Sequence, residues 1–314
     1  MSEILLSVVV AIGRRRDRAR RLLDALCSQS CIEALELVVV DLAPEGMPEV
    51  STAPGIRTLY VRYSEGTPLS DARVAGLRLA SAPVVAFLED HCYPTPGWAE
   101  AVIAVHGGPW VAVGYAITNA NPESYVSRAG LMSDYGLWMH PVKSGQRRLL
   151  TGSNVAYKRD LLLSFGEELA PLLAISFNLH QIFNRRGLPM YVESRALVAH
   201  ENFTDLVGLL HSNHVLCRLL ALGRVRSESW GVPRRLAYGL AVPPGAPALK
   251  LARLVYSLRD RPSLWRDFIL ALPLIVPVYL WSAIGESLGY LLPHGSTDEE
   301  YKWWEIEAER APAV

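Results

Sequence analysis

The chain has 314 residues, half of them hydrophobic, which allows one large domain or two ordinary domains with a sizeable core. Its 31 basic and 31 acidic residues cancel, so the overall charge does not indicate nucleic-acid binding. The four cysteines lack the spacing of a secreted disulfide scaffold or of paired CxxC zinc motifs. We therefore expect reduced thiols and a cytosolic catalytic portion.

The first part of the chain alternates strand, helix and strand. Residues 4–12 (ILLSVVVAI) are rich in β-branched side chains, residues 17–29 have apolar side chains at helical spacing, and residues 35–40 form a second apolar run. No basic region precedes the first run and no small-residue cleavage site follows it, so we expect a strand rather than a signal peptide. The second run ends at Asp41, and an acid at that position is typical of nucleotide-binding α/β folds. No GxGxxG loop is present, and Asp41 could equally cap the next turn.

A third strand at residues 56–61 and a helix at 66–80 lead to Glu89-Asp90-His91, which follows the apolar run at 83–88 (PVVAFL). Three ionisable groups at the end of a buried strand are costly unless something compensates them. Ligands of open α/β sheets bind at that edge. In an extended segment Glu89 and His91 point the same way, and both side chains can bind a divalent cation. From these residues alone, a metal site and a solvated strand end are equally good interpretations.

The α/β pattern continues to about residue 204. We expect further strands at residues 110–117 and 188–198, a helix around 124–139, a strand leading to a helix at 151–159, and a helix ending near Gly187. The last strand leads to His200.

Helical patterns replace the alternation beyond residue 205. Residues 231–262 alternate Pro or Gly breaks with arginine-bearing amphipathic pieces. Residues 268–292 are nearly all apolar and about as long as a membrane span, although Pro273, Pro277 and Glu286 weaken that interpretation. An interfacial or re-entrant helix pair, with arginines facing anionic lipid, and a buried helix of a soluble domain are the alternatives.

Three segments together resemble one enzyme family. The stretch around Glu89-Asp90-His91, followed by Pro94, Pro96, Gly97 and Trp98, is similar to the DXD region of the inverting GT-A glycosyltransferases of family 2. Residues 71–76 (DARVAG) resemble that family's Ala-Arg-Asn-x-Gly segment, and residues 152–159 resemble its Gly-x-Asn-x-Ala-x-Arg segment. The resemblance covers roughly residues 4–204 and implies a mostly parallel twisted sheet with helices on both faces.

The resemblance also implies a donor site. Two histidines would join a carboxylate at the metal, which favours Mn²⁺ over Mg²⁺. The implied metal ligands are Glu89, His91 and His200. The implied nucleotide-sugar contacts are Ala11, Asp41, Arg73, Glu89, Asp90 and Asn154.

One part of the family pattern is missing. The family carries a Glu-Asp pair whose acid is the catalytic base, and here that pair falls at Ile175 and Ser176. His180 and Glu168 are nearby but weak candidates for the base. Three possibilities follow: a relocated base, an acceptor acidic enough to need little help, or a chain that has lost transferase activity.

The predicted protein is a GT-A catalytic domain (residues 1–204) followed by a helical, membrane-associated region (205–314). We expect it to move a sugar, with inversion, from a nucleoside-diphosphate donor to a hydroxyl of a lipid-linked or cell-envelope glycan. Segment 268–292 would hold it on the cytoplasmic side of the membrane. The first alternative is a catalytically degenerate GT-A protein that binds a nucleotide sugar or acts as a membrane scaffold subunit. A weaker alternative is a nucleotidyltransferase.

Overall fold

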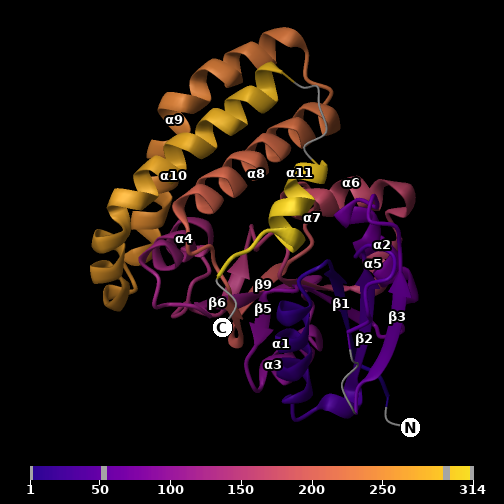
Figure 1. Cartoon of the computed structure of the whole chain (residues 1–314). Helices are drawn as coiled ribbons and strands as arrows, with labels where there is room; N and C mark the ends of the chain where they lie inside the picture. Colours follow the sequence, from indigo (N-terminus) through magenta and orange to yellow (C-terminus); the bar gives the residue numbers. More distant parts are fainter. Residues whose placement is uncertain (1–2, 51–54, 293–297, 312–314) are drawn as a thin grey trace. The chain divides into compact units, whose positions relative to one another are not determined.

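A computed structural model describes residues 3–50, 55–292 and 298–311. They divide into two compact units (Figure 1). The first runs to Thr118 and resumes at His140–His200; the second comprises Asn119–Met139 and the chain from Glu201 onward. Residues 119–139, which we expected in the first domain, thus group with the C-terminal helices. The functional division at residue 204 stays a prediction.

The first unit is built on a twisted sheet with strand order β3-β2-β1-β4-β8-β6-β9-β5, with β7 paired to β9. Its first four strands in that order are parallel. Every residue of β1, β2 and β4 is buried, as their largely apolar runs predict; the polar Ser7 and Glu36 within them hydrogen-bond to each other. These strands are β1 (Leu6–Ile12), β2 (Leu35–Asp41), β3 (Arg57–Arg62) and β4 (Val84–Glu89).

The other half of the sheet contains antiparallel pairings. β8 (Val155–Lys158) lies antiparallel between β4 and β6 (Ala112–Asn119), so β6 runs in the same direction as β4. β9 (Met190–His200) pairs antiparallel with β5 (Cys92–Pro94) and with β7 (Gly145–Arg147). The mostly parallel direction expected for a GT-A sheet therefore holds from β3 to β6, with β8 as an antiparallel insertion.

Helices cover both faces of this sheet. The connection from β1 to β2 through α1 and the connection from β3 to β4 through α2 move in opposite directions along the sheet. Because such connections are right-handed, α1 and α2 lie on opposite faces. Gly76 allows α2 to pack closely, since a Cβ there would lie 2.4 Å from Val9 Cγ1. The helices of this unit are α1 (Arg16–Cys27), α2 (Leu69–Leu79), α3 (Trp98–His106), α5 (Arg159–Leu163), α6 (Leu169–Ala174) and α7 (Ser176–Arg185).

The second unit is helical and has its own apolar core. In α10, Gly285 and Gly289 form a GxxxG pattern against α8, where added Cβ atoms would lie 2.2 Å from His214 O and 2.6 Å from Arg218 O. Glu286 of α10 pairs with Arg224 of α8 at 2.8 Å. The elements are α4 (Tyr125–Tyr135), α8 (Leu206–Ser227), α9 (Val232–Leu258), α10 (Trp265–Leu291), α11 (Asp298–Lys302) and the one-turn π-helix η4 (Trp303–Glu307).

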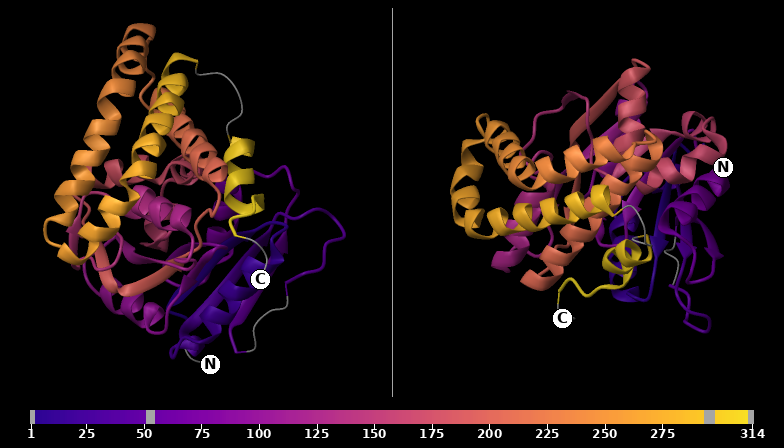
Figure 2. Two further views of the ribbon diagram at one scale, coloured as in Figure 1. Left: turned by 60° about the vertical axis from the view of Figure 1, so that its left-hand side comes forward. Right: turned by 90° about the horizontal axis from the view of Figure 1, so that it is seen from above.

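The expected breaks within residues 231–262 are wrong over most of that stretch. α9 continues through Pro243, Pro244 and Pro247, and α10 continues through Pro273 and Pro277. Proline normally removes a helical hydrogen bond, but packing of one long helix on another compensates such losses. The two helices lie side by side in both views of Figure 2. Leu206–Ser227 and Pro262–Leu291 are long and apolar enough to cross a membrane, by length and composition only.

Candidate active site

The carboxyl ends of three adjacent strands bring the predicted donor residues to one edge of the sheet. Ile12 of β1 lies opposite Asp41 of β2, and Ala11 of β1 lies opposite Glu89 of β4. Asp41 and Glu89 therefore flank the end of β1 at the edge where open α/β sheets bind ligands. Both carboxylates are buried.

Asp41 is surrounded by hydrogen-bond donors. Arg16 binds it with both terminal nitrogens, Nη1 to Oδ1 at 2.9 Å and Nη2 to Oδ2 at 2.8 Å. Oδ2 also accepts the Tyr60 hydroxyl at 2.5 Å and Arg62 Nη2 at 2.8 Å, and Oδ1 accepts the Ala43 backbone N–H at 3.0 Å. Two guanidinium groups thus compensate one buried carboxylate.

These contacts determine the charge state of Asp41. Burial raises the pKa of the carboxyl, but hydrogen bonds from Arg16, Tyr60, the Ala43 backbone and Arg62 outweigh burial and lower the pKa from 3.8 to about 2. Asp41 is consequently ionised at every physiological pH. The interpretation of Asp41 as a simple turn cap is incomplete, because its side chain also joins α1 to β3.

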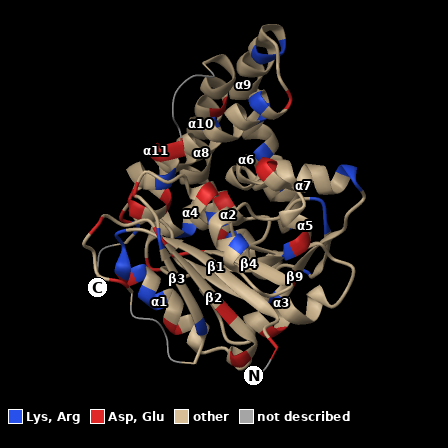
Figure 3. Cartoon of the chain, turned by 90° about the vertical axis from the view of Figure 1, so that its right-hand side faces the viewer, with Lys and Arg blue, Asp and Glu red and all other residues tan. Residues whose placement is uncertain are grey.

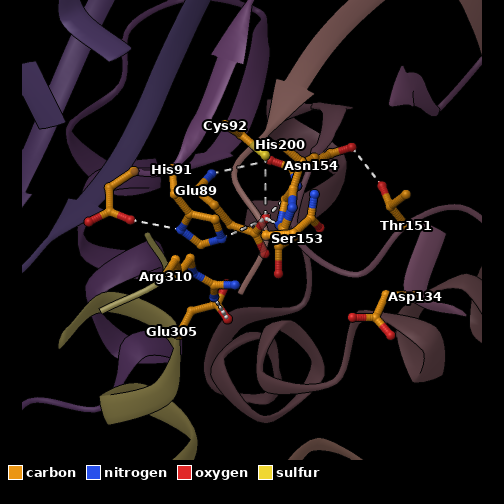
Figure 4. Close-up of polar contacts among 12 residues, drawn as sticks. Glu89, His91, Cys92, Asp134, Thr151, Ser153, Asn154, His200, Glu305 and Arg310 are labelled. Carbon is orange, nitrogen blue, oxygen red and sulfur yellow. Dashed lines mark hydrogen bonds and ion pairs between the residues drawn. The ribbon is translucent and has the colours of Figure 1, made fainter. Parts of the chain in front are cut away.

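Glu89 has a different environment, made of side chains that can bind a metal (Figure 4). Its Oε2 atom lies 3.7 Å from His91 Nε2 and 3.6 Å from His200 Nε2. Cys92 Sγ lies 3.6 Å from the same oxygen. The His91 and His200 rings meet edge to face, with centroids 4.8 Å apart. The three predicted metal ligands therefore come together around one carboxylate oxygen.

Asp90 points to a different set of partners. Its Oδ1 lies 2.9 Å from His91 Nδ1, and its Oδ2 accepts a hydrogen bond from Arg18 Nη2 at 3.2 Å. All three side chains are buried. A carboxylate on one ring nitrogen favours the tautomer with the proton there, which leaves Nε2 of His91 as a potential ligand toward Glu89. Asp90 thus orients the His91 ring from its Nδ1 side, opposite the Nε2 atom that faces Glu89.

Asn154 holds the Glu89 side chain and backbone together. Asn154 Nδ2 donates to Glu89 Oε2 at 2.6 Å, and Asn154 Oδ1 accepts from the Glu89 backbone N–H at 3.2 Å. The Thr151 hydroxyl donates to the Asn154 carbonyl at 2.7 Å, which fixes the segment before β8. Arg73 of α2 donates to the Ser153 hydroxyl at 3.2 Å, so α2 reaches the same segment.

Comparison with known proteins identifies the family. The family model "Glycosyl transferase family 2" matches residues 7–163, half of the chain. This chain belongs to glycosyl transferase family 2. Its fold is GT-A, as the motif order predicted.

Individual relatives agree with this assignment. The chain is 34% identical over 134 residues to two proteins named validoxylamine A glucosyltransferase, from Streptomyces hygroscopicus subspecies jinggangensis (strain 5008) and subspecies limoneus. Each match covers 38% of this chain and about a third of the relative's length (31% and 29%). The fold is similar to that of the mannosyltransferase PcManGT from Pyrobaculum calidifontis, solved with GDP-Man and Mn²⁺, with a TM-score of 0.54, 17% identity, and coverage of 96% of this chain and 88% of that chain.

The position of the family's usual catalytic base holds no acid. Ile175 and Ser176 are both buried at the junction of α6 and α7. His180 of α7 is fully buried, with Nε2 2.9 Å from the Tyr157 hydroxyl, and burial lowers the pKa of its ring to about 3. An imidazole in this environment is a core residue, which argues against His180 as the base. Glu168 is exposed at the end of the 3₁₀ helix η2 (Gly166–Glu168).

Several of the side chains that surround Asp41 and the Glu89 region were not predicted from the sequence. Arg62 could have been found, because parallel pairing of two strands of similar length places it opposite Asp41. Arg16 and Arg18 begin a helix that follows β1, among several arginines that look alike in the sequence, and Figure 3 shows α1 marked by basic residues. Cys92 gave no signal by residue type alone.

Proposed function

We propose that this glycosyltransferase moves a sugar from a nucleoside-diphosphate donor to an acceptor hydroxyl, with inversion at the anomeric carbon. The observation that carries the proposal is the convergence of two imidazoles on the buried Glu89 carboxylate at the carboxyl edge of β4. A buried carboxylate among potential metal ligands is the kind of site that binds the charged end of a nucleotide.

A divalent cation fits this donor set. Glu89, His91 and His200 supply one oxygen and two nitrogens, and nitrogen ligands favour Mn²⁺ or a similar transition ion over Mg²⁺. When bound, the cation offsets negative charge that develops on the leaving diphosphate. Asn154 holds Glu89 in place, and Asp90 holds His91. The Mn²⁺ in the PcManGT structure supports the same class of ion.

The nucleotide would lie along the ends of β1 and β2. Ala11 offers no side chain beyond Cβ, which leaves room beside the strand end, and Asp41 with Arg16 and Arg62 forms a fixed group of charges there. Arg73, which reaches the segment before β8, would face the phosphates. Preorganised charges of this kind favour a nucleotide because little reordering accompanies its binding.

The acceptor hydroxyl needs either a base or an intrinsic acidity of its own. His180 is enclosed in the core. Glu168, whose side chain is exposed, is therefore the remaining candidate for the base. A Glu168→Gln variant tests it: loss of transfer by about 100-fold with unchanged donor binding would support the base. Unchanged transfer would exclude Glu168 as the base and favour an acceptor hydroxyl that loses its proton without the help of this carboxylate.

We further propose a lipid-linked or cell-envelope glycan acceptor, reached from the cytoplasmic side of a membrane. More than half of the large exposed apolar side chains of the described residues lie on α9 and α10, including Leu240 (71% exposed) and Ile269 (59%). Charged residues are sparse along α10 (Figure 3). An apolar surface of this kind is costly in water and is stabilised by lipid.

Vesicle binding tests the membrane part. The full chain should sediment with vesicles of mixed anionic and neutral lipid, and Leu240→Gln combined with Ile269→Gln should reduce the bound fraction severalfold. Leu79→Gln, which changes an exposed leucine of the first unit, is the matched control and should bind like the parent. Equal binding by all three proteins would contradict the assignment of α9 and α10 to the membrane.

Transfer itself is tested with the purified chain and a panel of nucleoside-diphosphate sugars. Cation-dependent hydrolysis or transfer of one donor supports the proposal. Binding of a donor without any turnover over long incubation would instead favour the nucleotide-sugar-binding or scaffold role. Transfer of the nucleotide rather than the sugar would favour a nucleotidyltransferase.

A further inference from the structure

The carboxylate of Glu89 has a sulfur neighbour that the family pattern does not include. Cys92 begins β5, which pairs antiparallel with β9, and its register partner is His200. Directly opposite residues of an antiparallel pair place their side chains on the same face of the sheet. The backbone pairing of β5 with β9, rather than a chance rotamer, therefore brings the Cys92 thiol beside the His200 ring.

The donor atoms are spaced as metal ligands are. Cys92 Sγ and His200 Nε2 each lie 3.6 Å from Glu89 Oε2, and these three atoms lie within 4.8 Å of one another. Two ligands of one tetrahedral ion, at about 2.0–2.3 Å from it, are separated by about 3.5 Å. The two distances from Glu89 Oε2 match that value. All three side chains are buried, so bulk water screens little of their mutual interaction.

One divalent cation between these three atoms would contact oxygen, nitrogen and sulfur together.

We propose that Cys92 is a thiolate ligand of the cation bound by Glu89 and His200, and that the site consequently selects Zn²⁺ or Co²⁺ over Mg²⁺. This inference rests on the metal site of the proposed function. Thiolate is a soft ligand that Mg²⁺ does not favour, whereas Zn²⁺ binds mixed Cys, His and carboxylate sets. With His91 of the proposed site the ion would have four protein ligands, and Zn²⁺ can expand to five-coordinate when a further oxygen binds. His91, held by Asp90, lies against the same Glu89 oxygen.

Cobalt spectroscopy on the full chain tests the thiolate directly. After removal of bound metal, Co²⁺ should produce visible bands together with an intense near-ultraviolet band from sulfur-to-cobalt charge transfer. Cys92→Ser should lose the near-ultraviolet band and bind Zn²⁺ about 100-fold more weakly, with its weak Mg²⁺ affinity unchanged. Cys217→Ser, which alters another buried cysteine, should keep the band and the affinity.

A second measurement does not depend on the variant's folding. In the parent protein, Zn²⁺ should protect Cys92 from alkylation, read by mass spectrometry, while Mg²⁺ should not. Visible cobalt bands without the near-ultraviolet band, or measurable alkylation of Cys92 in the metal-free protein that Zn²⁺ does not slow, would overturn the thiolate and leave the metal site of the proposed function intact. No Co²⁺ binding by the folded parent would overturn both.

Discussion

Two buried carboxylates end β2 and β4, the strands on either side of β1, and their surroundings are opposite in kind. Asp41 is enclosed by donors: two guanidinium groups, a tyrosine hydroxyl and a backbone N–H. Glu89 accepts an amide N–H of Asn154 and lies beside two imidazoles and a thiol. The first carboxylate is neutralised by the protein's own cations, and the second is arranged to share a cation that the protein binds.

This difference separates a carboxylate that the protein's own arginines neutralise from a carboxylate that a bound cation would neutralise. A buried carboxylate with fixed cationic partners stabilises the fold and keeps its charge over a wide pH range. A buried carboxylate among potential metal ligands gains its full stabilisation only when the ion binds. A change at Asp41 should therefore mainly lower folding stability, whereas a change at Glu89 should mainly lower cation-dependent function.

The largest expected effect is at Glu89. Glu89→Gln keeps an oxygen for Asn154 to bond but removes the charge on which the cation depends, so turnover of the donor should fall by about 1000-fold while the unfolding midpoint changes little. Steady-state assays with saturating cation measure turnover, and thermal unfolding measures the unfolding midpoint. Asp160→Asn, an exposed carboxylate of α5, is the matched control. Parent-like turnover of Glu89→Gln would remove Glu89 from the site.

Asp41→Asn should show the opposite pattern, with stability responding most. Removing one partner from a buried ion-pair group leaves Arg16 and Arg62 without their shared carboxylate, which should lower the free energy of unfolding by about 3 kcal/mol. Urea denaturation measures it, with Asp71→Asn, an exposed acid of α2, expected within about 0.5 kcal/mol of the parent. An Asp41 variant as stable as the parent would show that the arginines do not depend on it.

Asp41 should also account for part of the loss of folding stability at low pH. Because its pKa is about 2 in the folded protein and 3.8 ordinarily, its contribution is complete above pH 3.8 and is lost as pH falls toward 2. The loss corresponds to about 2 kcal/mol. Urea midpoints at a series of pH values should fall less steeply in this window for Asp41→Asn than for the parent. Identical slopes would contradict the assigned ion pairs.

The smallest effect on turnover is expected at His180. His180→Gln can still bond the Tyr157 hydroxyl, and turnover should stay within about threefold of the parent, whereas loss of a general base costs about 100-fold or more. The lowered pKa of His180 means that the unfolded chain takes up a proton first, so stability is full above pH 6.5 and declines as pH falls toward 3. The folding stability of His180→Gln should not show this part of the decline between pH 6.5 and pH 3. A 100-fold loss of turnover would restore His180 as the base.

Much of the fold could be predicted from the sequence because its signals are local. Largely apolar runs predicted β1, β2 and β4, and Asp41 at the end of β2 predicted a ligand-binding edge. The continuity of α9 through three prolines could not be predicted, because it depends on packing against another helix. The antiparallel insertion of β8 between β4 and β6 is likewise a long-range pairing.

The site was predictable in outline and not in detail. His91 and His200 were expected near Glu89 through the motif order, and the structure brings them there. Cys92 was not, because its position depends on the register of β5 with β9, more than one hundred residues apart in the chain. Asp90 follows Glu89 directly, yet it faces Arg18 and the far side of His91, as strand alternation predicts.

Calorimetry of donor binding tests the central claim most directly. Nucleoside diphosphates and their sugars would be titrated into the full chain with Zn²⁺, with Mn²⁺ and with no divalent cation, in the parent and in Glu89→Gln. We expect that one nucleotide binds, that binding requires a cation, and that Glu89→Gln loses the cation-dependent part of the affinity. Binding of equal strength with and without cations, or unchanged in Glu89→Gln, would contradict this expectation, as would no binding by the folded parent under any condition.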